Sequence, residues 1–368
     1  MIVAEPWATS AAGRAGLERR YASPVRRFLF VAATLVPGLL LAQESRTEEE
    51  ITVERVLVDA RVTNYGGEPV LGLTPADFDV KIDGKPASVE SVEWIPETAA
   101  ARFAAGIDEE EYASQESGAP KGRLFVYFIQ TDFARNKARI SGQMKFLSYA
   151  GQMIDGLETY DRVAVFSFDS HLKFRLDFSD DKSEIKEAIH SAILIDDPPP
   201  PQVVANPSLA RRLDRDAMNR ATSPDEALIL VGNALRHIPG PKSMILFGWG
   251  MGILSNGRVV MHHKYPIARR SLESARVTVF ALDMTDADYH DLEIGLGKAA
   301  ADTGGFYAKT HIFPKIAVDR LERTLAGHYE LEVRKPPTEK RGAHTIEVRV
   351  RKKGTHVLAR TSYVDRAE

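Results

Sequence analysis

Strand-like apolar runs alternate with helix-length segments from residue 123 onward, and this alternation constrains the fold more than any other feature. Residues 124–129 are apolar without a break, which is typical of a strand buried on both faces. A segment with helical spacing of apolar residues follows at about 134–156, and strand patterns follow at 161–168 and 172–178. Strands that alternate with helices predict a mostly parallel sheet covered on both faces.

The next segments extend this pattern to six strands. Only Asp169, Ser170 and His171 separate the second and third strands, so we expect those two to pair antiparallel. Three further strands, with helical segments around them, are expected at 243–247, 276–282 and 305–308.

The two ends of the chain carry shorter runs that alternate with period two, as half-buried strands do. Small sheets of two or three strands are marginal alone, so we expect both ends to combine into one small β-sandwich. Residues 97–121 are rich in alanine and acidic residues without an apolar period, which predicts a flexible linker. The predicted parts are a signal peptide (1–42), sandwich strands (43–96 and 328–368), the linker (97–121) and an α/β domain (122–327).

The N-terminal segment has the pattern of a secretory signal. Arg26 and Arg27, with three earlier arginines, precede the apolar run 28–41, which ends at Ala42. We therefore predict export, to the periplasm or the medium, with no membrane span after cleavage at about residue 42. A buried helix or a membrane anchor is the alternative.

Composition and missing motifs exclude several functions. The chain has no cysteine, which excludes disulfides, thiolate zinc sites and cysteine nucleophiles. Its formal net charge of −3, without a long basic stripe, argues against nucleic-acid binding. No zinc-protease motif, nucleophile elbow or phosphate-binding loop occurs, so we predict that the protein is not an enzyme. The adjacent pair His262-His263 is interpreted as a poor chelate, because neighbouring residues on a helix point apart.

Five motifs, in order along the chain, carry a resemblance to a known family. They are VTNYGGEPVLGLTPADF at 62–78, IDGK at 82–85, IPGPKS at 238–243, TGG at 303–305 and HTIEVRV at 344–350. In these motifs the chain resembles the VWFA-related family of secreted bacterial proteins, first described from acidobacteria. The resemblance implies a von Willebrand A-type, Rossmann-like doubly wound α/β domain with a mostly parallel six-stranded sheet, inserted in the all-β sandwich.

Many A-type domains bind Mg²⁺ at a metal-ion-dependent adhesion site, and the resemblance locates the corresponding positions. The Asp-x-Ser-x-Ser motif of the family falls on Gln130, Asp132 and Ala134, and the aspartate after the fourth strand falls beside Trp249. A divalent ion of this kind needs several oxygen ligands, so we predict a degenerate site, no bound metal and no cofactor.

Three hypotheses for function remain open. In the first, the carboxyl edge of the sheet binds an unidentified protein or cell-surface ligand without metal, through Asp132, Arg135, Thr222 and Trp249. Trp249 has the alternative of simple packing over the sheet edge.

In the second hypothesis, Asp132, Asn136 and Thr222 form a rebuilt site for Mg²⁺-dependent adhesion. In the third, Asp132, Asp169 and Asp283 converge at the strand ends as a cryptic hydrolase. The lack of a recognisable nucleophile–base pair makes the third the least favoured.

Overall fold

The computed structural model describes residues 54–115, 118–131, 137–193, 197–200, 202–205 and 207–365. The described residues belong to one compact unit. The predicted signal peptide lies outside the described residues, and so do Asp132, Ala134, Arg135 and Asn136. Across the described part of the chain, no helix is long and apolar enough to cross a membrane.

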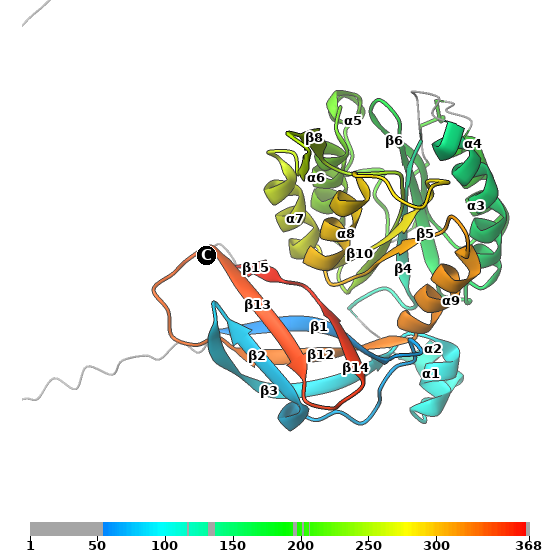
Figure 1. Ribbon diagram of the computed structural model, residues 1–368. Coiled ribbons are helices and arrows are strands. Elements are labelled where there is room, and N and C mark those ends of the chain that lie inside the picture. Colours follow the sequence, from blue (N-terminus) through cyan, green and yellow to red (C-terminus); the bar gives the residue numbers. More distant parts are fainter. Residues whose placement is uncertain are drawn as a thin grey trace, which may run out of the picture. The chain divides into compact units, whose positions relative to one another are not determined.

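Both ends of the chain build one seven-stranded sheet with the strand order β14-β1-β12-β3-β2-β13-β15 (Figure 1). All neighbours in it run antiparallel, and β1 lies between two strands from the other end of the chain. The 3₁₀ turn η1 (Pro75–Asp77) precedes the second strand. The strands are β1 (Arg55–Asn64), β2 (Phe78–Ile82), β3 (Lys85–Pro96), β12 (Gly327–Arg334), β13 (Ala343–Val350), β14 (Thr355–Ala359) and β15 (Ser362–Val364).

The predicted fold class is wrong in its all-β part, because the strands form one curled sheet and not a sandwich of two sheets. The sheet buries its own core, which includes Val58, Phe78, Tyr329 and Leu331. A register shift between Glu332 and Val333 interrupts the pairing of β12 with β3. Such bulges increase the twist of a strand, which helps a single sheet curl over its own side chains.

The second sheet has six strands in the order β11-β10-β7-β4-β5-β6. The predicted antiparallel pairing of the second and third strands is confirmed for β5 and β6, and the other four pairs are parallel. The strands are β4 (Leu124–Gln130), β5 (Arg162–Phe168), β6 (Leu172–Ser179), β7 (Lys242–Gly248), β10 (Val277–Asp283) and β11 (Tyr307–Lys309).

This sheet is therefore mixed, and the predicted Rossmann-like, doubly wound class does not describe it. Three residues between β5 and β6 are too few for the crossover that a parallel pair needs. At the other edge, β11 contributes only three residues to the pairing.

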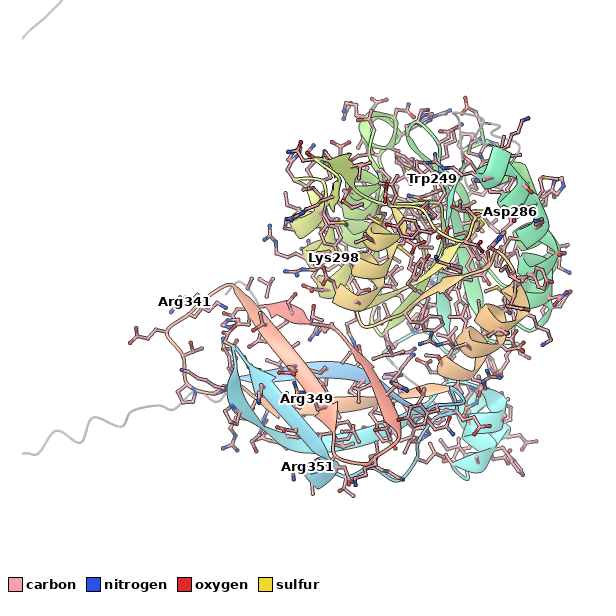
Figure 2. The ribbon with its side chains drawn as sticks, viewed as in Figure 1. Trp249, Asp286, Lys298, Arg341, Arg349 and Arg351 are labelled. Atoms are coloured by element: carbon pink, nitrogen blue, oxygen red, sulfur yellow. The ribbon has the colours of Figure 1, made fainter. Side chains whose placement is uncertain are left out.

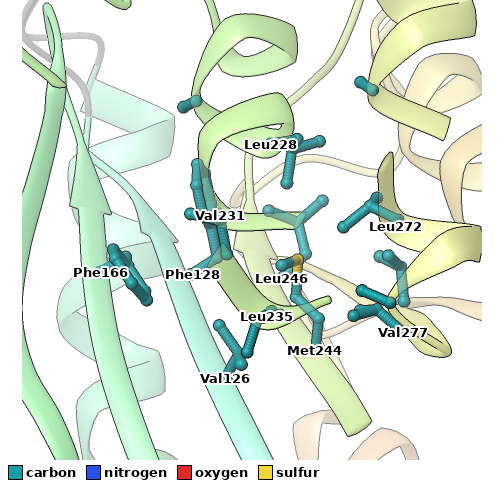
Figure 3. Close-up of a cluster of buried hydrophobic side chains, with 14 of the residues drawn as sticks. Val126, Phe128, Phe166, Leu228, Val231, Leu235, Met244, Leu246, Leu272 and Val277 are labelled. Carbon is teal, nitrogen blue, oxygen red and sulfur yellow. The ribbon is translucent and has the colours of Figure 1, made fainter. Parts of the chain in front are cut away.

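Helices cover both faces of the six-stranded sheet (Figure 1). Successive residues of a strand point to opposite faces, so Phe125 and Tyr127 face one core while Val126 and Phe128 face the other. Figure 3 shows the core that contains Val126 and Phe128. The first core includes α3 (Lys137–Asp155), α4 (Lys182–Ile193) and α9 (Pro314–Thr324). The second includes α5 (Arg215–Arg220), α6 (Pro224–Leu235), α7 (Tyr265–Ser274) and α8 (Glu293–Asp302).

Two small additions complete the fold. A hairpin of β8 (Ile253–Ser255) and β9 (Arg258–Val260) follows β7. Where the sequence predicts a flexible linker, the structure has the short helices α1 (Ala99–Ala104) and α2 (Glu109–Ser114). Arg102 of α1 is buried and forms ion pairs with Glu109 at 3.0 Å and Glu158 at 3.3 Å. The ion pairs of the buried Arg102 hold this segment in place, and no apolar stripe does so. The period of the apolar residues therefore could not predict the two helices.

Candidate functional site

The carboxyl ends of three neighbouring parallel strands meet at one edge of the six-stranded sheet. Gln130 ends β4, Gly248 ends β7 and Asp283 ends β10. Trp249 and Asp286 lie on the loops that leave this edge, and both are labelled in Figure 2. Open α/β sheets bind ligands at such edges, so this is the candidate site.

Gln130 is fully buried, and its amide is bonded to the backbone of the neighbouring loop. Its Oε1 accepts hydrogen bonds from the backbone N–H groups of Trp249 (3.0 Å) and Gly250 (3.3 Å). Its Nε2 donates to the carbonyl oxygen of Gly250 at 3.0 Å. The side chain at the position where the resemblance implies a metal-binding aspartate thus fastens the loop after β7 to the end of β4.

Gly248 leaves no space for a side chain beside this amide. A Cβ at this position would lie 2.8 Å from Oε1 of Gln130 and 2.9 Å from Cδ2 of Leu296. The backbone there approaches its neighbours so closely that an aspartate at the end of β7 would require both of them to move.

Trp249 both packs on the edge and keeps part of its surface in solvent. Its Nε1 donates to the carbonyl oxygen of Thr131 at 3.4 Å, and the guanidinium of Arg139 lies 3.7 Å from the ring centroid. The residue is half-buried. The two interpretations of Trp249, packing and partner contact, are therefore compatible.

Thr222 precedes α6 and is bonded to a side chain in the first turn of that helix. Its N–H and hydroxyl both donate to Oε2 of Glu226, at 2.8 and 3.3 Å. Glu226 also pairs with Lys264, and that hydrogen bond is the main reason why the pKa of the carboxyl falls to about 2. No hydrogen bond or ion pair between described residues joins Thr222 to Trp249; their polar partners are Glu226 for the first and Thr131 for the second.

Asp283 is buried at the end of β10 and has several partners. Its Oδ2 lies 2.7 Å from Nε2 of His290 and accepts a hydrogen bond from the Tyr307 hydroxyl at 2.7 Å. Burial alone would raise the pKa of Asp283, but hydrogen bonds from His290, Thr285 and Tyr307 hold it below its ordinary value. Glu293 lies close enough to share a cation with Asp283 and His290, but it pairs with Lys309 at 2.7 Å.

The convergence of aspartates that the third hypothesis requires is not found for the two that are described, Asp169 and Asp283. Asp169 follows β5, and β4 and β7 lie between that strand and β10. Three strand spacings correspond to about 14 Å between Asp169 and Asp283. Asp169 pairs instead with Lys173 at 2.9 Å, so each carboxylate has local partners.

A cavity opens where α3 meets the loop after β11. It has a volume of about 310 Å³, and its lining includes Lys145, Asp286, His311 and Ile312. Asp286 bonds Lys145 at 2.6 Å and lies 2.6 Å from Nδ1 of His311. The hydrogen bond from Lys145 is the main cause that lowers the pKa of Asp286 to about 2.

Large apolar side chains stand exposed on the loops of the same edge, and our sequence reasoning missed them. They follow β7, β10 and β11 and keep 55 to 65 % of their surface in solvent: Ile253, Leu254, Tyr289, Ile312 and Phe313. For Ile253, Leu254, Ile312 and Phe313, the available signal was their place outside every predicted strand and helix, whereas Tyr289 falls within the helix predicted at 288–303. The adjacent histidines His262 and His263 were expected to point apart on a helix. They precede α7 and are not part of it, and their ring centroids lie 4.1 Å apart.

No family model and no curated protein matches this chain. Several solved structures are similar to it. One is a D319A mutant of the PilB minor pilin from Streptococcus sanguinis, at 11 % identity and TM-score 0.36, with 57 % of this chain and 62 % of the pilin covered. This chain thus spans less than two thirds of the pilin.

Another is the von Willebrand factor type A structure from Catenulispora acidiphila, at 11 % identity and TM-score 0.36, covering 83 % of this chain and 74 % of the other. A third is the manganese-loaded TRAP protein of Plasmodium vivax, at 13 % identity and TM-score 0.37, covering 64 % and 92 %. The similar structures thus include a von Willebrand factor type A protein, at low sequence identity.

Proposed function

We propose that this protein is an exported, non-catalytic binding module that holds a protein or cell-surface ligand at the carboxyl edge of its six-stranded sheet without a metal ion. The observation that carries the proposal is the set of exposed apolar side chains on the loops after β7, β10 and β11. Exposed apolar side chains that gather on one side of a folded protein are candidates for contact with a partner, and Ile312 and Phe313 also line one cavity.

The neighbourhood of these side chains also suits a protein partner. Trp249 with Arg139 stacked on its ring supplies an aromatic and an arginine contact, the residue types enriched at protein interfaces. The cavity beside Ile312 could accept one side chain of the partner. The loop after β7 is held by the hydrogen bonds of Gln130, so it loses little conformational entropy when a partner binds.

The bonds of Gln130 support metal independence. A ligand for Mg²⁺ must offer a free oxygen, whereas Oε1 of Gln130 already accepts two backbone hydrogen bonds. The alternative, a rebuilt Mg²⁺ site at Asp132, Asn136 and Thr222, would have to share Thr222 with Glu226.

Membership of the acidobacterial VWFA-related family and a periplasmic or secreted location belong to the same proposal. Their support is the set of motifs between residues 62 and 350 and the basic and apolar pattern of residues 1–42.

A binding assay on immobilised bacterial envelope and extracellular-matrix proteins tests the proposal. We expect saturable binding that is equal in Mg²⁺ and in EDTA, and at least tenfold weaker for Phe313→Ser. Phe103→Ser is the matched control, because Phe103 is 85 % exposed on α1, which packs against β3. Binding that both variants retain would contradict the location, and binding that EDTA abolishes would contradict metal independence.

Calorimetric titration with Mg²⁺ separates the two metal hypotheses directly. We expect no heat of binding at millimolar Mg²⁺. Saturable heat that Asp132→Ala abolishes would make the protein an adhesion domain with an unorthodox ligand set.

A further inference from the structure

A second cluster of polar side chains lies in the seven-stranded sheet. Asp59 of β1 and Glu330 of β12 are directly paired in register, and His328 lies two residues before Glu330 on the same face. One ligand atom from each of these three residues lies within 4.8 Å of the other two.

His328 is the unusual member, because only one of its ring nitrogens has a partner. Nδ1 lies 2.9 Å from Oε1 of Glu97. Nε2 is buried without a hydrogen-bond partner, and it faces Oδ1 of Asp59 at 3.6 Å. The side chain as a whole is 1 % exposed. A carboxylate on one ring nitrogen and an open second nitrogen is the arrangement of histidine ligands in metal sites.

His344, the other buried histidine of this sheet, has a partner on each of its two ring nitrogens. Its Nδ1 lies 2.7 Å from Asp83 and its Nε2 lies 2.9 Å from Asp365. A buried polar atom without a partner destabilises a folded protein, and a ligand bound to Nε2 of His328 would remove that cost.

The distances suit an ion of the size of Zn²⁺. Tetrahedral ligands at about 2.1 Å from Zn²⁺ lie about 3.4 Å from one another, close to the separation between His328 and Asp59. Asp59 and Glu330 keep 19 % and 29 % of their side chains exposed, so an ion can reach them from solvent.

Arg276, which precedes β10, already contacts both carboxylates. Its Nη2 lies 2.5 Å from Oδ1 of Asp59 and 2.7 Å from Oε2 of Glu330, and its Nε donates to Oδ2 of Asp59 at 3.1 Å. Oε1 of Glu330 accepts no hydrogen bond from any described residue. The guanidinium therefore competes for Oδ1 of Asp59 but leaves Oε1 of Glu330 available to an ion.

We propose that Asp59, His328 and Glu330 form a binding site for one divalent transition-metal ion, with Zn²⁺ as the preferred ion. One imidazole and two carboxylates, with no thiolate, suit Zn²⁺ better than Mg²⁺ or Ca²⁺, which favour oxygen ligands alone. The bound ion would tie β1 to β12.

The test uses the whole protein, freed of metal with EDTA, in calorimetric titration with Zn²⁺ and in thermal unfolding. We expect the wild type to bind one equivalent with a rise in Tm. His328→Asn should bind at least tenfold more weakly, because asparagine can keep the bond to Glu97 while it removes Nε2. His344→Asn is the matched control and should retain the wild-type affinity.

Two further results decide the location of the ion. His290→Asn removes the histidine of the Asp283 cluster, and a loss of binding there with none in His328→Asn would overturn the proposal. Absence of saturable Zn²⁺ binding to the wild type at submillimolar ion would overturn it as well. If His328→Asn fails to fold, X-ray absorption of the Zn²⁺-loaded His290→Asn variant, which lacks the imidazole of the other cluster, takes its place. One imidazole with oxygen ligands supports the site, and two or more imidazoles contradict it.

Discussion

The carboxyl edge of the six-stranded sheet and the β1–β12 pair of the seven-stranded sheet both bury a polar side chain, but they complete its bonding differently. The amide of Gln130 forms three hydrogen bonds with the backbone of the loop after β7. In His328, Nδ1 pairs with Glu97, and Nε2 has no hydrogen-bond partner. Gln130, at the position where the family resemblance implies a metal ligand, therefore already has a full set of hydrogen-bond partners, whereas His328 does not.

The largest expected effect tests how rigidly the carboxyl edge is built. Gly142→Ala on α3 would bring a Cβ to 1.4 Å from the carbonyl oxygen of Met284, so the helix and the loop after β10 must separate. We expect the free energy of unfolding, measured with urea, to fall by more than about 3 kcal/mol. In the same helix, Gly151→Ala meets no atom within 4 Å and should stabilise by about 0.5–1 kcal/mol.

Gln130→Ala should have the next largest effect. It leaves the N–H groups of Trp249 and Gly250 and the carbonyl of Gly250 without their partners, which predicts a loss of about 2–4 kcal/mol in urea unfolding. Gln152→Ala, on the exposed side of α3, should change the value by less than about 0.5 kcal/mol. Equal effects of the two changes would mean that the amide does not hold the loop.

The ion pair of Asp365 with His344, whose two ring nitrogens both have partners, predicts a loss of stability at low pH. Burial would raise the pKa of Asp365, but hydrogen bonds from Lys335 and His344 lower it to about 2. A carboxyl whose pKa is lowered by folding stabilises the native state above pH 4, and this contribution is lost as the pH falls toward 2.

Asp365→Asn should therefore cost about 1–2 kcal/mol at neutral pH and progressively less below pH 4. Urea unfolding of both proteins between pH 2 and 7 measures the difference. A cost that is independent of pH would show that packing, not the charge of Asp365, supports His344.

Trp249→Phe should have the smallest effect. It removes the hydrogen bond from Nε1 to Thr131, which at 3.4 Å is long, and keeps an aromatic ring beneath Arg139. We expect a loss of about 0.5 kcal/mol in urea unfolding. A loss comparable to that of Gln130→Ala would mean that the indole of Trp249, and not the amide of Gln130, holds the loop after β7 against the end of β4.

Local patterns predicted most individual elements but not how the all-β strands close. The unbroken apolar run at 124–129 identified β4 because each face of that strand meets its own core. The single curled sheet was missed because β1 pairs with β12 and β14, more than 260 residues away, and no local pattern encodes that choice. The two helices at 99–114 depend on the ion pairs of Arg102, which periodicity does not register.

The candidate sites divide in the same way. The role of Thr222 beside a helix start was open to prediction, since Ser223 and Glu226 have the spacing of a capping box. The Gln130 substitution was visible only through the family resemblance, and its three bonds were not visible at all. Asp59 and His328 are brought together by strand pairing alone, so their spacing in the sequence carries no motif.

The position of β1 between two late strands has a consequence for biosynthesis. Until residues 327–334 have been made, β1 has neither of its neighbours, and it lacks the second until residue 359; its backbone groups meanwhile remain open to pairing with other chains. Closure over such a sequence distance is slow. A chain cleaved before β12 would therefore expose a strand on both sides, which makes an incomplete protein a target for proteases and chaperones while the finished one conceals that strand.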